Sequence, residues 1–166
     1  MNLPLGVSRF LAKNVKSFDP KRELEELSTA SFSGYLIESS FGGLGVEESA
    51  LLFRNGQAIG AVYEYYGAHH TLSGDGALPH VMNAFLSAEG VLDGIDLSAQ
   101  QVDLVVAFNA SLKLSTPISK GMFKSLVKDR FDASLGQSIA IARNPAQPAS
   151  KESLFKKFGL AGIENH

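Results

Sequence analysis

The chain has 166 residues, a mass of 17.7 kDa and a formal net charge of −2, with 45% hydrophobic and 19% charged residues. This composition is typical of one globular domain and excludes a fully disordered or fibrous chain. The lack of cysteine excludes disulfide bridges, thiolate metal centres and thiol nucleophiles. A slightly acidic chain also argues against an electrostatic grip on nucleic acid by the whole domain.

The N-terminal segment does not follow the pattern of a secretory signal. Its apolar start contains Pro4 and Gly6, and Arg9, Lys13 and Lys16 follow it, which reverses the basic-then-apolar order of such signals. No window reaches the roughly 18 consecutive apolar residues that a membrane-spanning helix needs. We therefore expect a cytoplasmic protein without membrane insertion.

The first elements are a short strand or arm over Leu3–Phe10 and a helix over residues 20–30. Asp19 is the expected N-cap of this helix, and a proline occupies its first helical position, where the missing N–H does no harm. Leu24 and Leu27 form its apolar stripe, while five charged side chains are expected to face water, those of Lys21, Arg22, Glu23, Glu25 and Glu26. This spacing predicts a helix that lies on a core.

An antiparallel meander follows. The aromatic and β-branched run Phe32–Glu38 predicts a strand, and the glycines of Phe41–Gly45 predict a turn after it. Two further apolar runs, Ser49–Arg54 and Gln57–Tyr65, flank the dipeptide Asn55-Gly56. Because both residues tolerate positive φ, this pair predicts a two-residue type I′ hairpin turn.

A second helix is expected after Asp75, with apolar residues at helical spacing and Gly90 at its end. A short strand is expected over Val91–Leu97. Ser98, with Gln101 three residues later, then forms a capping box that begins a third helix.

The third helix carries two apolar stripes. One contains valines and Asn109, and Leu104 and Phe108 lie on an adjacent stripe. Two stripes predict burial on more than one side. The valines of the first stripe are Val102, Val105 and Val106.

The character of the chain changes after Leu114. Residues 115–117 (Ser-Thr-Pro) predict a linker, and a fourth, basic amphipathic helix is expected over 119–131. Residues 1–115 hold 7 basic and 13 acidic side chains, whereas 116–166 hold 8 and 4. We therefore expect three regions. They are an α+β body over 1–115, a basic helical extension over 116–145, and a linker with a C-terminal amphipathic segment over 146–166.

Four side chains are candidates for a metal site: His69, His70, Asp75 and His80. Imidazole and carboxylate are ligands of divalent metals. Their spacing matches no known ligand pattern, and adjacent histidines on a strand point to opposite faces. The residues therefore favour a polar loop that caps the following helix, and we expect no metal and no cofactor.

The glycine-rich segments Gly42–Gly45 and Gly74–Gly76 lack the Lys-Ser/Thr pair of a phosphate-binding loop. No serine lies in a nucleophile elbow. The acidic pair Glu47-Glu48 lies near a turn, where we expect solvated carboxylates. A small-ligand-binding protein or an enzyme, with a pocket near Gly42–Gly45 and His69–His80, remains an alternative function.

The C-terminal segment has the pattern of a groove-binding peptide, with spaced apolar anchors and a charged frame. Packing on its own domain or on a second copy of the chain is an equal alternative. A nucleic-acid accessory role would instead require a continuous basic face near Lys120, Lys124, Lys128, Arg130 and Arg143. The expected partner-binding residues are Leu154, Phe155, Lys156, Lys157, Phe158 and Leu160.

The order of strands and glycines resembles the PATAN-type domain, which has a strand, a glycine-containing hairpin, a helix and a further strand. The matching segments are Phe32–Ile37, Ser49–Phe53, Asn55-Gly56, Ile59–Ala61 and Ala88–Gly90. The chain is also similar to an uncharacterised archaeal family related to that domain, whose members share the hairpin and end in a basic-aromatic glycine motif, here Lys157-Phe158-Gly159.

The resemblance covers residues 30–112 and the tail. It implies a non-catalytic protein-interaction or signalling adaptor module, and it transfers no catalytic residue. The expected fold is α+β, with an antiparallel meander of four to five strands, helices packed mainly on one face and a helical basic C-terminal region.

Overall fold

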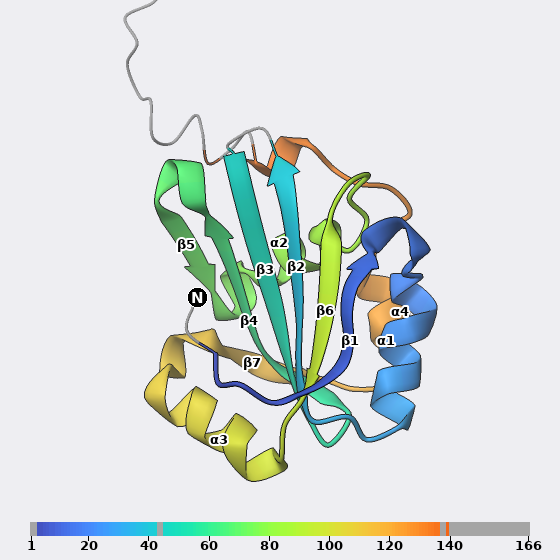
Figure 1. Ribbon diagram of the computed structural model, residues 1–166, viewed down its shortest axis with the longest axis vertical. Helices are drawn as coiled ribbons and strands as arrows, with labels where there is room; N and C mark the ends of the chain where they lie inside the picture. Colours follow the sequence, from blue (N-terminus) through green and yellow to red (C-terminus); the bar gives the residue numbers. More distant parts are fainter. Residues whose placement is uncertain (1–2, 43–44, 137–138, 140–166) are drawn as a thin grey trace, which may run out of the picture.

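The computed structural model describes residues 3–42, 45–136 and 139 (Figure 1). In this part of the chain the fold is α+β, and seven strands form one antiparallel sheet in the spatial order β1-β6-β2-β3-β4-β5, with β7 also paired to β4. The expected four to five strands were therefore too few. The strands are β1 (Val7–Asn14), β2 (Gly34–Gly42), β3 (Gly45–Arg54), β4 (Gln57–Tyr65), β5 (His70–Ser73), β6 (Val91–Asp96) and β7 (Lys113–Ile118). The α-helices are α1 (Pro20–Thr29), α2 (Leu78–Ala84), α3 (Ala99–Phe108) and α4 (Phe123–Leu126).

The predicted hairpin turn joins β3 and β4. Asn55 and Gly56 have φ angles of 49° and 81°, as a type I′ turn requires. A Cβ atom on Gly56 would lie 2.3 Å from the carbonyl oxygen of Ser28, so α1 approaches too closely for any other residue. The turn therefore sets the register of the hairpin and admits α1 beside it.

Both predicted helix starts are confirmed. The Asp19 side chain accepts a hydrogen bond from the backbone N–H of Arg22, and the capping box of Ser98 and Gln101 is formed in both directions. The second helix, in contrast, ends at Ala84 rather than at Gly90. The residues that follow instead lead into β6.

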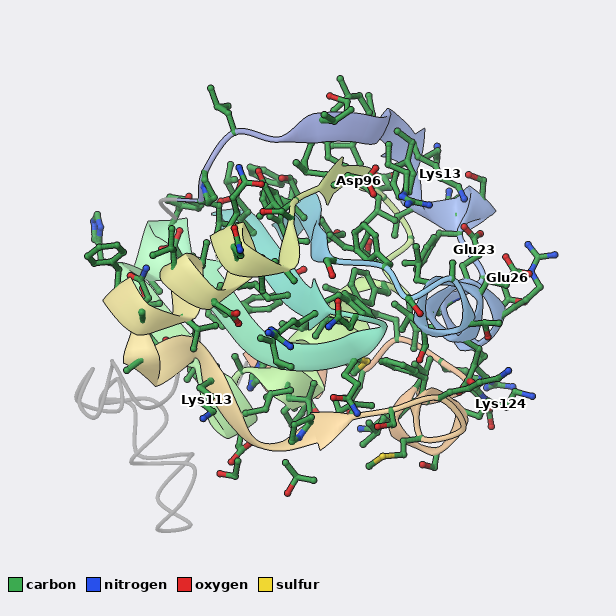
Figure 2. The ribbon with its side chains drawn as sticks, turned by 90° about the horizontal axis from the view of Figure 1, so that it is seen from below. Lys13, Glu23, Glu26, Asp96, Lys113 and Lys124 are labelled. Carbon is green, nitrogen blue, oxygen red and sulfur yellow. The ribbon has the colours of Figure 1, made fainter. Side chains whose placement is uncertain are left out.

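The sheet has a core on each face. Helices α1, α2 and α4 cover one face, and α3 covers the other. Helices α1 and α4 lie side by side at one end of the sheet (Figures 1 and 2). The prediction that α3 is buried on more than one side is wrong, because Leu104 is 56% exposed and Phe108 83% exposed. The buried residues of α3 are Val102 and Val105, which belong to the second core.

Residues 115–117, expected as a linker, belong to β7, so the expected boundary at residue 115 falls inside a strand. Strand β7 pairs with β4, and its last residue, Ile118, is buried in the core. The expected helix over 119–131 is reduced to the four residues of α4. The helical basic C-terminal region is thus not confirmed.

Strand β1 forms an edge of the sheet and continues past the expected arm to Asn14. Ion pairs fix it at two points: Arg9 lies 2.7 Å from Asp96 of β6, and Lys13 lies 2.5 Å from Glu23 of α1. Figure 2 shows Lys13 and Glu23 together where β1 meets α1. Each α-helix in the described residues is too short or too polar to span a membrane.

Candidate functional site

The face of the sheet that carries the larger core becomes polar toward one end of β2 and β3. Alternation along β2 places Glu38 on the same face as the core residue Leu36. In the β2–β3 register Glu38 is opposite Ser49, and Ser40 is opposite Glu47. Two carboxylates and two hydroxyls therefore face the region between the sheet and α2.

Glu38 is fully buried. Its carboxylate accepts hydrogen bonds from the hydroxyls of Ser49 at 3.4 Å and Ser87 at 3.2 Å. Burial, with a smaller contribution from the charge of Glu47, raises the pKa of Glu38 to about 7 against the lowering effect of its serine hydrogen bonds. At neutral pH this group is therefore close to half-protonated.

Glu47 is 8% exposed, so the prediction of a solvated carboxylate is wrong. The hydroxyl of Tyr63 donates to its Oε2 at 2.7 Å, whereas Oε1 receives no hydrogen bond from a described residue. Its carboxylate lies against the backbone of Gly42, where a Cβ atom would be 2.1 Å from Oε1. The glycine predicted as part of a turn thus makes room for this side chain.

A tyrosine and a histidine lie next to this pair. The hydroxyl oxygen of Tyr65 is 2.8 Å from Nδ1 of His80, and the rings of Tyr63 and Tyr65 are 4.7 Å apart. Burial lowers the pKa of His80, and the nearby His70 lowers it further. Burial also raises the pKa values of Tyr63 and Tyr65, so the tyrosines and the histidine are uncharged at neutral pH.

These groups border a cavity of about 440 Å³ between the ends of β2, β3 and β4, helix α2 and residues 131–136. The last of these segments, orange in Figure 1, passes the ends of β2 and β3. Asn83 of α2 holds it through two hydrogen bonds with the backbone of Asp132, at 3.1 and 2.7 Å. Phe41, which is 79% exposed, and Phe131 lie at the mouth.

The four candidate metal ligands do not converge. His80 lines the cavity, but Asp75 accepts hydrogen bonds from the backbone and hydroxyl of Ser115. His69 has a left-handed backbone with φ 46°, and His70 begins β5, so this segment is not the expected loop. Within the described residues no three His, Asp or Glu side chains are placed to hold a metal ion.

Sequence reasoning identified Gly42 and His80 as pocket residues but missed the two carboxylates. A signal for Glu38 was present, because it lies two residues after Leu36 in a strand and shares its inward face. For Glu47 the same rule applies, since it lies two residues before the buried Ser49. In the prediction, the proximity of Glu47 to a turn outweighed this alternation, and Glu38 was treated only as part of a strand.

The expected partner-binding residues Leu154, Phe155, Lys156, Lys157, Phe158 and Leu160 lie outside the described residues, as does Arg143. Of the other basic residues considered for nucleic acid, Lys128 forms an ion pair with Asp132 at 2.8 Å. That pair places one cation of the expected basic face beside a carboxylate.

Comparison of the chain with known proteins gives a match that covers the first two thirds of it. No curated protein and no solved structure matches it significantly. One family model matches residues 1–109, which contain β1 to β6 and α1 to α3 and most of the cavity lining. The chain therefore belongs to the family described as an uncharacterized protein conserved in archaea (DUF2226).

Proposed function

We propose that this protein binds a small organic molecule in the cavity beside α2. The observation that carries the proposal is Glu47, a buried carboxylate that borders the cavity and has one oxygen without a donor among the described residues. Oε1 is open to the cavity rather than sealed in the protein, because no fully buried side-chain nitrogen or oxygen of the described residues lacks a hydrogen-bond partner. A ligand that donates to Oε1 would complete the hydrogen bonding of this group.

The form of the cavity supports the same function. Its volume of about 440 Å³ lies within the range of small-molecule sites, roughly 300–1,000 Å³. Such sites combine apolar walls with a few convergent polar groups. Here the rings of Tyr63 and Tyr65 and the side chain of Leu135 supply apolar surface, while Glu47 and His80 supply polar atoms.

The test is a ligand-observed NMR screen of a chemically mixed fragment library, with a variant that obstructs the cavity. Ala88 is an exposed residue of the lining, so Ala88→Phe places a ring at the cavity with little effect on the core. The matched control is Ala107→Phe, at an alanine that is also exposed and lies on α3 across the sheet. We expect fragments that bind the wild type and Ala107→Phe but not Ala88→Phe. A library without such fragments would contradict the proposal.

A protein-interaction or signalling adaptor role is the second candidate function. The apolar and basic pattern of residues 154–160 and the resemblance to PATAN-type modules support it. Affinity capture from native extract with the full chain, the 1–149 truncation and a Phe155→Ser/Phe158→Ser variant tests this role. We expect one partner that the full chain retains and both altered chains lose. A partner retained equally by all three would place the interaction elsewhere.

A further inference from the structure

The charge of the cavity lining indicates the class of ligand. Three carboxylates, those of Glu47, Glu89 and Asp132, belong to the described lining, which contains no lysine or arginine. Glu38 adds a further carboxyl group behind it. An anionic ligand would meet only like charges in this lining, and opposite charge is what favours binding.

The three carboxylates differ in availability. Asp132 is paired with Lys128 at 2.8 Å and accepts hydrogen bonds from Ser134, and these contacts lower its pKa to about 2. Glu89 is exposed at the cavity mouth. Glu47 is buried, and its Oε1 remains unpaired. Glu47 is therefore the one largely buried carboxylate in this lining with an oxygen that is open to a donor from the cavity.

The walls around Glu47 are aromatic. Tyr63 donates to its Oε2, and the ring of Tyr65 packs on that of Tyr63. Phe41 and Phe131 extend this surface toward the mouth. Aromatic faces attract cations and also accept apolar groups. His80 does not oppose a cation, because burial keeps its imidazole neutral.

We propose that the ligand is a small protonated amine with an apolar substituent, whose N–H donates to Oε1 of Glu47. This inference rests on the proposed ligand-binding function and specifies its ligand class. The N–H is required because Oε1 is an acceptor. The apolar substituent is required because the remaining walls are aromatic and aliphatic.

Three probes of similar size test the proposal: 2-phenylethylammonium, neutral 2-phenylethanol and anionic phenylacetate. Their affinities are measured by NMR titration at pH 7 and low salt. Hydrogen bonds to charged groups contribute roughly 1.5–3 kcal/mol, which corresponds to about tenfold or more in affinity. We therefore expect the alcohol and the anion to bind at least about tenfold more weakly than the amine.

The charge of Glu47 is tested with Glu47→Gln, which keeps an acceptor for Tyr63. The matched control is Glu48→Gln, which removes the same charge from the neighbouring residue on the opposite face of β3. We expect Glu47→Gln to weaken amine binding about tenfold and to weaken alcohol binding less, because the alcohol loses no ion pair. Glu48→Gln should leave both affinities unchanged. Circular dichroism melts confirm that each variant is folded.

Two results would overturn the amine proposal. One is an amine that binds no more tightly than the alcohol, and the other is equal weakening by Glu47→Gln and Glu48→Gln. If the fragment screen nevertheless gives ligands that Ala88→Phe excludes, the cavity binds a different chemical class. If the screen gives none, the proposed function fails as well.

Discussion

The two ends of β2 and β3 lie on the same face of the sheet, but one end packs into the core and the other borders the cavity. In one half Leu36, Leu51 and Phe53 pack into the larger core. In the other half the same alternating positions carry Glu38 and Glu47, which border α2 and the cavity. The β2–β3 pairing register runs without a shift through both halves. The difference shows that residue type at inward positions, rather than backbone shape, separates the structural half of this face from the candidate site.

The largest expected effect comes from breaking the apolar half. Phe53 is fully buried, and its ring lies 5.4 Å from that of Phe32 and 5.9 Å from that of Phe123. Phe53→Ala should lower the free energy of unfolding by about 3–5 kcal/mol, because it removes buried surface and leaves a cavity. Phe108→Ala, the same deletion at an exposed site, should cost less than about 0.5 kcal/mol. Urea unfolding measures both, and similar losses would contradict the assigned cores.

In the polar half, the stability that Glu38 contributes should fall as pH rises. A carboxylate whose pKa is lowered on folding has the opposite pH dependence. The pKa of Glu38 is about 7 in the folded protein and 4.5 in its reference state, so the folded state binds more protons between these values. Stability from this group is therefore present below about pH 4.5 and is lost as pH rises through 7. The total loss is at most about 3 kcal/mol.

Glu38→Gln removes this titration and keeps hydrogen-bonding capacity toward Ser49 and Ser87. The variant should therefore gain stability over the wild type as pH rises from 5.5 to 8.5 in urea unfolding experiments. Glu48→Gln serves as the control. If the difference between Glu38→Gln and wild type is constant across this range, Glu38 is not a buried carboxyl group of raised pKa.

The smallest expected change in the free energy of unfolding concerns the hydrogen bond between Tyr63 and Glu47. Tyr63→Phe removes the hydroxyl that donates to Glu47 and should cost about 1–2 kcal/mol, because a buried carboxylate loses its donor. Tyr66→Phe removes a hydroxyl that donates to Glu48 on the exposed side, and it should cost a few tenths of a kcal/mol. Thermal unfolding compares them. Equal costs would show that the hydrogen bond to Glu47 has no special weight.

The features predicted correctly from the sequence depend on neighbouring residues. The turn at Asn55-Gly56 and the caps at Asp19 and Ser98 each require interactions within a few positions of the chain. Strand β7 was not recognised, because Ser-Thr-Pro is typical of a linker and its pairing partner β4 lies far back in the sequence. A proline in this position is compatible with pairing, since β7 is at an edge of the sheet.

The candidate site was predictable only in part, because its residues come from segments that are distant in the sequence. Its lining combines residues from 40–42, Glu47, Tyr63 and Tyr65, and residues from 80–89 and 131–136, which no periodicity connects. Gly42 and His80 attracted attention through residue type. The role of Gly42 depends on the contact with Glu47, which only the β2–β3 register creates. The pairing of distant strands, which composition and motifs do not reveal, therefore determines which residues meet in the site.

One edge of β4 pairs with two different strands, β5 and β7, and this affects how the chain folds during synthesis. Along that edge Val62 to Tyr65 pair with β5, whereas Ala58 and Gly60 pair with β7. Strand β5 follows β4 directly, but β7 emerges from the ribosome only after α2, β6 and α3. Part of β4 therefore stays unpaired while most of the domain is made, and an unpaired strand edge promotes association between chains. This part of the β4 edge is therefore covered only when residues 113–118 are complete.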